Sequence, residues 1–240
     1  MVKNNKIVVT GGSGRFAQSL KKTKNKLKFF YPSKKQLDIT KVESIKKYLK
    51  KNRPKSLLHL AGLSRPMIEH ETNINKSITL NIIGTSNLVK VCSEFKIKLI
   101  YFSTSYVYPG KKGNSTELDP LLPWNNYAWS KLGGECAVQM YKNSLILRVC
   151  MTEKPFVHKK AFANVKINFI FHDELAKILI KLLNKKGIIN VGGPTRTVYN
   201  FAKKYNSKVK KIFINKNSLN KFPLNTFMNL SKLKKINKIN

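Results

Sequence analysis

The sequence has few acidic residues, few cysteines and no long apolar run. Its 240 residues include 11 Asp and Glu. Three scattered cysteines, Cys92, Cys136 and Cys150, argue against a disulfide framework and predict buried free thiols. The four dispersed histidines give no metal-ligand spacing, so we expect no metal site. Without a membrane-length apolar run or a signal-peptide pattern at the N-terminus, we expect a cytoplasmic protein with no membrane partner.

Basic residues, in contrast, are abundant. The chain has 47 Lys and Arg and a formal net charge of +36, but arginine occurs only at 15, 53, 65, 148 and 196. The lysines are spread along the chain and form no stripe with interleaved aromatic residues. This pattern favours a general compositional bias and disfavours nucleic acid as a partner. A positive field of this kind still attracts anionic cofactors and substrates.

Short apolar runs alternate with helical patterns through the first 150 residues. Such alternation is typical of an α/β fold in which parallel strands have helices on both faces, a Rossmann-type doubly wound sheet. The predicted strands cover residues 6–10, 26–31, 56–62, 97–105 and 144–149. The predicted helices cover residues 14–24, 41–51, 75–95 and 127–142, with Thr40 as the N-cap of the second.

The pattern loosens after Val149. We predict a strand over 167–171, a strand over 187–193 and a short terminal helix. Between the two strands, the segment 172–185 has a helical pattern, and we expect Asp173 to start that helix. Residues 1–150 are therefore interpreted as a dinucleotide-binding domain. Residues 151–240 are interpreted as a reduced substrate-binding lobe, interleaved with late elements of the sheet at about 167–192.

The segment TGGSGRFA follows the first predicted strand and opens the first predicted helix. Gly11, Gly14 and Ala17 give the spacing of a dinucleotide site, where glycines allow a tight turn and close approach of a pyrophosphate to the helix N-terminus. The second strand ends without the acid that binds the ribose of NAD, and offers Ser33 and Lys34 instead. Together with Arg15, these residues favour NADP(H), while NAD(H) stays open.

Several motifs in order resemble the extended short-chain dehydrogenase/reductase superfamily, and most closely its dTDP-4-dehydrorhamnose reductase branch. The similarity covers about the first 150 residues and later patches such as FHDELAKIL and GIINVGG. The motifs that carry it are TGGSGRFA, LDIT at 37–40, HLAG at 59–62, Asn81, FSTSYVYPG at 102–110 and YAWSK at 127–131.

The resemblance implies roles by position. It makes Thr104, Tyr127 and Lys131 the catalytic set, with Tyr127 as general acid and Thr104, Ser105 and Tyr106 next to the substrate. A lysine one helical turn from a tyrosine stabilises the phenolate, so we expect Lys131 to lower the pKa of Tyr127. The cofactor residues that it implies, beside Tyr127 and Lys131, are Gly11, Ser13, Gly14, Arg15, Phe16, Ser33, Lys34, Asp38, Ile39, Leu60, Ala61, Gly62 and Asn81.

The expected reaction is reduction of a 4-keto-6-deoxy nucleotide sugar by NAD(P)H. The absence of an acidic residue directly after Thr104 disfavours a dehydratase. Between Arg148 and Asp173 the chain is shorter than is usual in this family, which places substrate-contacting residues there. We therefore expect a sugar pocket that is trimmed or partly supplied by a partner. A nucleotide-sugar epimerase and a cofactor-binding regulatory or scaffold protein remain alternatives. Pairing of two copies as a homodimer is also left open.

Overall fold

A six-stranded parallel sheet forms the centre of the protein. The structure is a computed structural model that describes residues 6–156, 158–215 and 223–238; the first five residues, part of the segment in which we expect no signal peptide, lie outside it. The strand order is β10-β5-β4-β3-β1-β2, with neighbouring strands parallel. The strands are β1 (Lys6–Thr10), β2 (Lys28–Phe30), β3 (Ser56–His59), β4 (Lys98–Thr104), β5 (Ser144–Val149) and β10 (Gly187–Val191).

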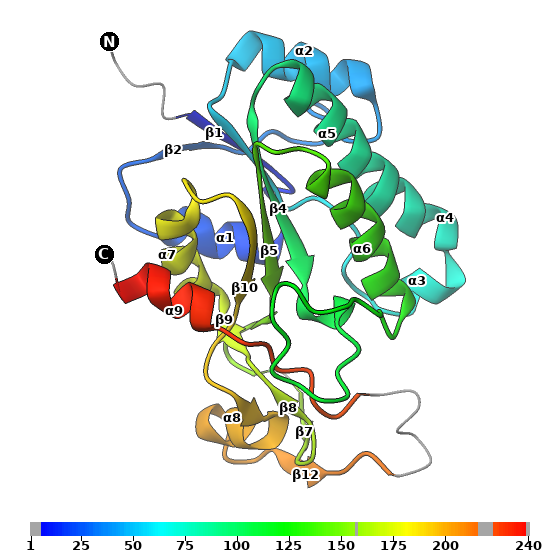
Figure 1. Ribbon diagram of the computed structural model, residues 1–240, viewed down its shortest axis with the longest axis vertical. Coiled ribbons are helices and arrows are strands. Elements are labelled where there is room, and N and C mark those ends of the chain that lie inside the picture. The colour runs from blue at the N-terminus through cyan, green and yellow to red at the C-terminus, as the bar shows by residue number, and fades with distance from the viewer. Residues whose placement is uncertain (1–5, 157, 216–222, 239–240) are drawn as a thin grey trace.

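Helices cover both faces of this sheet (Figure 1). On one face Leu20 and Leu175 belong to the apolar core between the sheet and α1 (Arg15–Lys22), α7 (His172–Leu182) and α9 (Ser231–Lys238). On the other, Ile45, Leu88 and Val138 belong to the core beneath α2 (Val42–Asn52), α5 (Gly84–Glu94) and α6 (Asn126–Gln139). Because both faces are covered, the central strands are almost wholly buried, as in β5. The predicted Rossmann-type doubly wound fold is confirmed.

Two details in the first half differ from the prediction. Helix α2 has Lys41 as its N-cap, and the Thr40 hydroxyl instead donates to the Asp38 carboxylate at 2.8 Å. The predicted helix over 75–95 is helical as far as Glu94, but a π-helical segment η1 (Ile78–Ile83) lies between α4 (Ile74–Ser77) and α5. A short helix α3 (Glu69–Thr72) precedes α4, and a 3-10 turn η2 (Ser105–Val107) follows β4.

The second half contains the larger errors. The strand predicted over 167–171 is two short strands, β8 (Lys166–Ile167) and β9 (Ile170–Phe171), which pair with β11 (Arg196–Thr197) and β6 (Met151–Thr152) respectively. Helix α7 begins at His172 with Phe171 as its N-cap, and Asp173 lies in the first turn. The prediction of three buried cysteines is wrong for Cys136, which is exposed on α6.

A small lobe lies below the sheet in Figure 1. It contains helix α8 (Val198–Tyr205), which the sequence did not predict, and strands β7 (Lys160–Phe162) and β12 (Lys210–Ile212), which pair with each other. Phe156, Phe171 and Phe201 form its apolar core. Within the ranges that the structure describes, no helix combines the length and apolar character needed to cross a membrane.

A buried ion pair joins the sheet to α6. Arg148 on β5 and Glu135 on α6 are 2% and 0% exposed, and Nη2 of Arg148 lies 2.6 Å from Oε1 of Glu135. Nη1 of Arg148 donates to the Tyr108 hydroxyl at 2.7 Å, and that hydroxyl donates to Asn190 on β10. A charge can be buried here because its counter-charge and hydrogen-bond partners are buried with it.

Candidate active site

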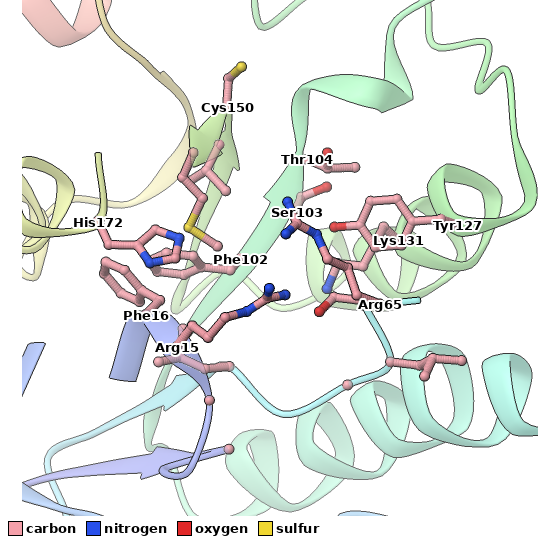
Figure 2. Close-up of a pocket in the computed structure, with 18 of the residues that line it drawn as sticks. Arg15, Phe16, Arg65, Phe102, Ser103, Thr104, Tyr127, Lys131, Cys150 and His172 are labelled. Carbon is pink, nitrogen blue, oxygen red and sulfur yellow. The ribbon is translucent and has the colours of Figure 1, made fainter. Parts of the chain in front are cut away.

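A cavity of about 210 Å³ opens at the carboxyl edge of the sheet. It is lined by the segments that follow β1, β3, β4 and β5. Strand β2 lies on one side of β1 and β3 lies on the other side, so the direction in which strands are added to the sheet reverses at β1. Open α/β sheets bind ligands at such a switch point, where neighbouring loops diverge. Figure 2 shows the labelled side chains that surround the cavity.

The glycine loop after β1 has the backbone expected of a phosphate-binding turn. Gly11 has φ +72°, and a Cβ there would lie 2.6 Å from the backbone nitrogen of Ala61. The amide of Gly14 donates to the Gly11 carbonyl at 2.9 Å, and Gly14 is the N-cap of α1 without a side-chain cap. The N-terminus of α1 therefore faces the cavity with backbone N–H groups available to an anion.

Asn81 braces the loop after β3 from behind. Its Oδ1 accepts from the Leu63 amide at 2.7 Å, and its Nδ2 donates to the Leu63 carbonyl and to the Ser130 hydroxyl on α6. Gly62 has φ +153°, and a Cβ there would lie 2.7 Å from Oδ1 of Asn81. Asn81 is 1% exposed, so it fixes the cavity wall without forming part of its surface.

Thr104, Tyr127 and Lys131 converge on the cavity from two elements. Thr104 ends β4, whereas Tyr127 and Lys131 lie on one face of α6, whose N-cap Asn125 accepts from the Ala128 amide. The Thr104 hydroxyl acts on the Tyr127 phenol and lowers its pKa, against the larger effect of burial. Nζ of Lys131 lies 4.1 Å from the centre of the Tyr101 ring, a cation–π contact. Tyr127 and Lys131 therefore face the cavity.

The pKa of Tyr127 is raised, which is opposite to the expected direction. Burial is the main cause, and the Thr104 hydroxyl and the charge of Arg65 oppose it. Burial also lowers the pKa of Lys131 to about 7, against the effect of Glu135. Burial of these two side chains removes water that would stabilise the charged form. The phenol therefore keeps its proton to higher pH and the ammonium loses its proton at lower pH.

Three other side chains of the cavity, His59, His172 and Cys150, are poorly suited to donate a proton at neutral pH. Burial, aided by the charge of Lys131, lowers the pKa of His59 to about 3. Burial also lowers the pKa of His172 from its ordinary value and raises that of the Cys150 thiol to about 12. Both imidazoles are therefore mainly neutral, and Tyr127 is the hydroxyl acid placed beside Thr104.

An aromatic wall holds the Tyr127 ring in place. The ring lies edge-on to His70 of α3, with centroids 5.2 Å apart, and edge-on to Tyr106 at 6.2 Å. Tyr106 in turn packs against Trp124 at 4.9 Å. The wall leaves the phenol few orientations, which favours one position of its hydroxyl.

Two arginines meet one carboxylate across the cavity. Nη1 of Arg15 and Nη1 of Arg65 both donate to Oε1 of Glu153, at 2.5 and 2.9 Å. Arg15 begins α1, Arg65 lies in the loop after β3, and Glu153 follows β6. The arrangement ties three loops together and turns Arg15 towards Glu153. It therefore gives no support to Arg15 as a contact for a 2′-phosphate.

The structure brings together most of the expected site residues. The cavity lining includes Gly11, Gly14, Arg15, Phe16, Leu60, Ala61, Gly62, Thr104, Ser105, Tyr106, Tyr127 and Lys131. The remaining expected residues are described but lie outside the lining, namely Ser13, Ser33, Lys34, Asp38, Ile39 and Asn81. Ser13, Ser33 and Lys34 are exposed, whereas the Ile39 side chain belongs to the core between the sheet and α2. The sequence did not indicate Arg65, Phe102, Ser103, Cys150, Glu153 or His172, which also line the cavity.

A dinucleotide-type loop, a strand-end threonine and a Tyr–Lys pair at one sheet edge define the class of extended short-chain dehydrogenases/reductases. The chain belongs to the family whose model is described as "RmlD substrate binding domain", which matches residues 5–165.

The curated relatives include a subunit of another enzyme and a sugar-nucleotide reductase. The chain is 32% identical over 114 residues to a methionine adenosyltransferase 2 subunit beta from Xenopus laevis, covering 47% of this chain. It is 31% identical over 103 residues to a dTDP-4-keto-6-deoxy-D-glucose reductase from Streptomyces niveus, covering 42% of this chain. These matches span only 34% and 35% of the two relatives' own lengths.

Similarity to solved structures extends over the whole fold. A dTDP-4-dehydrorhamnose reductase from Bacillus anthracis, in complex with NADP, superposes with a TM-score of 0.85 at 21% identity. The superposition covers 97% of this chain and 92% of that one. The fold is therefore shared over nearly the whole of this chain.

Proposed function

We propose that the protein reduces the keto group of a 4-keto-6-deoxy nucleotide sugar, using NADPH. The observation that carries the proposal is the meeting of Thr104, Tyr127 and Lys131 in the cavity that the glycine loop also lines. A nucleotide-sugar substrate suits a cavity with two arginines, because its diphosphate is anionic. The N-terminus of α1 is left for the pyrophosphate of the cofactor.

Each side chain has a defined task in this reaction. The nicotinamide, when bound, supplies a hydride to the carbonyl carbon. Thr104 donates a hydrogen bond to the carbonyl oxygen, and Tyr127 transfers its phenolic proton to that oxygen as charge develops there, so that the ketone becomes an alcohol. Lys131, as an ammonium, binds the ribose hydroxyls of the nicotinamide and favours the phenolate left on Tyr127.

The cofactor preference rests on the end of β2. Ser33 and Lys34 are exposed there, and no carboxylate occupies the place that would select the 2′-hydroxyl of NAD. This supports NADP(H), with NAD(H) as the alternative. The similarity to a reductase in complex with NADP is in line with it.

The test is to incubate the purified chain with NADPH and a dTDP-4-dehydro-6-deoxy sugar and to follow NADPH oxidation. Tyr127→Phe should lower turnover by about 10²–10⁴-fold and leave NADPH affinity almost unchanged, because it removes only the proton donor. Tyr205→Phe, on α8 outside the cavity lining, is the matched control and should retain full turnover. Normal turnover of Tyr127→Phe would remove this residue as the acid.

Two other functions are tested by the same assay. An epimerase would use the same Tyr–Lys pair and would interconvert sugars without net NADPH oxidation. A nucleotide-binding subunit without turnover is favoured by one observation, the similarity to a subunit of methionine adenosyltransferase. Cofactor binding without either sugar reaction would support the subunit.

A further inference from the structure

The Tyr127 hydroxyl faces an arginine that the family motifs did not indicate. Arg65 comes from the loop after β3 and lines the cavity together with Ser103, Thr104 and Tyr127. Figure 2 shows its side chain extending into the cavity towards Ser103 and the hydroxyl end of Tyr127. Glu153 anchors it on the far side through the 2.9 Å contact with Nη1.

Arg65 and Lys131 differ in how well they can supply a positive charge. A guanidinium stays charged at every working pH, whereas an ammonium can lose its proton when buried. Lys131 lies over the Tyr101 ring, and its pKa of about 7 leaves it only partly charged at neutral pH. Arg65 is 44% exposed in its side chain, so solvent offsets much of the cost of its charge.

We propose that Arg65, anchored by Glu153, is a positioning residue whose permanent charge stabilises the phenolate form of Tyr127. A role of Arg65 in catalysis rests on the proposed function, whereas its electrostatic effect on the Tyr127 phenol does not depend on that function. In agreement, the charge of Arg65 lowers the pKa of both Tyr127 and its neighbour Tyr106, against the larger effect of burial.

Other titratable groups surround Tyr127 and must be separated from Arg65 in any test. They come from α3, β4, η2, α6 and the cavity rim, and they are His70, Tyr101, Tyr106, Lys131, Arg15, Glu153 and Cys150. Arg15 provides the sharpest comparison, because it binds the same oxygen of Glu153 as Arg65 does. It carries the same charge, but Figure 2 shows its side chain on the Phe16 side of the cavity, away from Tyr127.

The experiment places 3,5-difluorotyrosine, whose phenol is intrinsically more acidic than that of tyrosine, at position 127. Its ¹⁹F chemical shift is followed against pH in the full chain, without cofactor or sugar. Arg65→Gln should raise the midpoint pH by about one unit, since a phenolate loses its neighbouring cation. Arg65→Lys should recover most of that change, and Arg15→Gln should leave the midpoint within a few tenths of a unit.

Two results would overturn the proposal. One is an unchanged midpoint in Arg65→Gln, and the other is an equal rise in Arg15→Gln. Arg65→Met, which keeps the aliphatic stem, provides a second neutral variant if Arg65→Gln does not fold. Because the titration needs no substrate, a failed sugar assay would refute the proposed function and leave this inference standing.

Discussion

The buried Lys131 makes cofactor binding depend on pH in a way that can be calculated. We expect the affinity for NADPH to fall as pH rises from 6 to 8. The proposed contact with the ribose hydroxyls needs the ammonium form, and the pKa of Lys131 in the free protein is about 7. The ammonium fraction therefore falls from about nine-tenths at pH 6 to about one-tenth at pH 8.

Binding that requires one proton loses affinity in the same ratio, so Kd should rise about tenfold over this interval. Stability changes in the other direction. The unfolded pKa of Lys131 is 10.5 and the folded one about 7, so the unfolded state binds more protons between these values. The contribution of Lys131 to the free energy of unfolding therefore increases with pH across that window. Deprotonation of Lys131 does not destabilise the fold at pH 8, so weaker NADPH binding at that pH cannot be explained by unfolding that Lys131 causes.

The assay is a fluorescence titration with NADPH at several pH values. Lys131→Met should bind weakly at pH 6 and should lose the tenfold dependence, which separates Lys131 from His172 and from the phosphates of the ligand. An equal pH dependence in the wild type and in Lys131→Met would refute the reasoning, because some other group would then carry the proton.

Two further outcomes test other parts of the structure. Glu135→Leu leaves the Arg148 guanidinium buried without its counter-charge, which should lower the free energy of unfolding by about 3–5 kcal/mol in urea denaturation. Adding Arg148→Met should restore most of this, and no recovery would mean that the pair is not the cause. Lys34→Glu should weaken NADPH binding more than NADH binding, and equal effects on the two ligands would contradict the assigned cofactor preference.

The sequence predicted the sheet and its helices because their signals are local. Each central strand is rich in consecutive apolar residues and most of the helices have an apolar stripe, so these patterns mark them along the sequence. The roles of Thr104, Tyr127 and Lys131 were predicted from the family resemblance. Its motifs place a threonine at the end of a strand and a tyrosine–lysine pair near the start of a helix.

The predictions that were wrong concern features that depend on contacts between segments distant in the sequence. Strands β8 and β9 are two residues each, and only their partners β11 and β6 separate them. The direction of the Tyr127 pKa was wrong because burial, which a sequence does not show, outweighs the nearby charges. A signal for Arg65 did exist, since arginine is rare in this lysine-rich chain. Three of its five arginines, Arg15, Arg65 and Arg148, pair with glutamates in the structure.

The position of Asn81 depends on the number of residues in the π-helical segment η1. A π-turn holds one residue more than the α-helical turn that it replaces. Loss of a single residue between Ile78 and Ile83 would let an α-helical turn replace the π-turn, so that α4 and α5 keep their relative orientation while Asn81, which lies within the turn, changes position and direction. Asn81 could then not face both Leu63 and Ser130, which it joins at present. Homologous chains that keep this bridge should therefore tolerate substitutions in η1 far better than deletions.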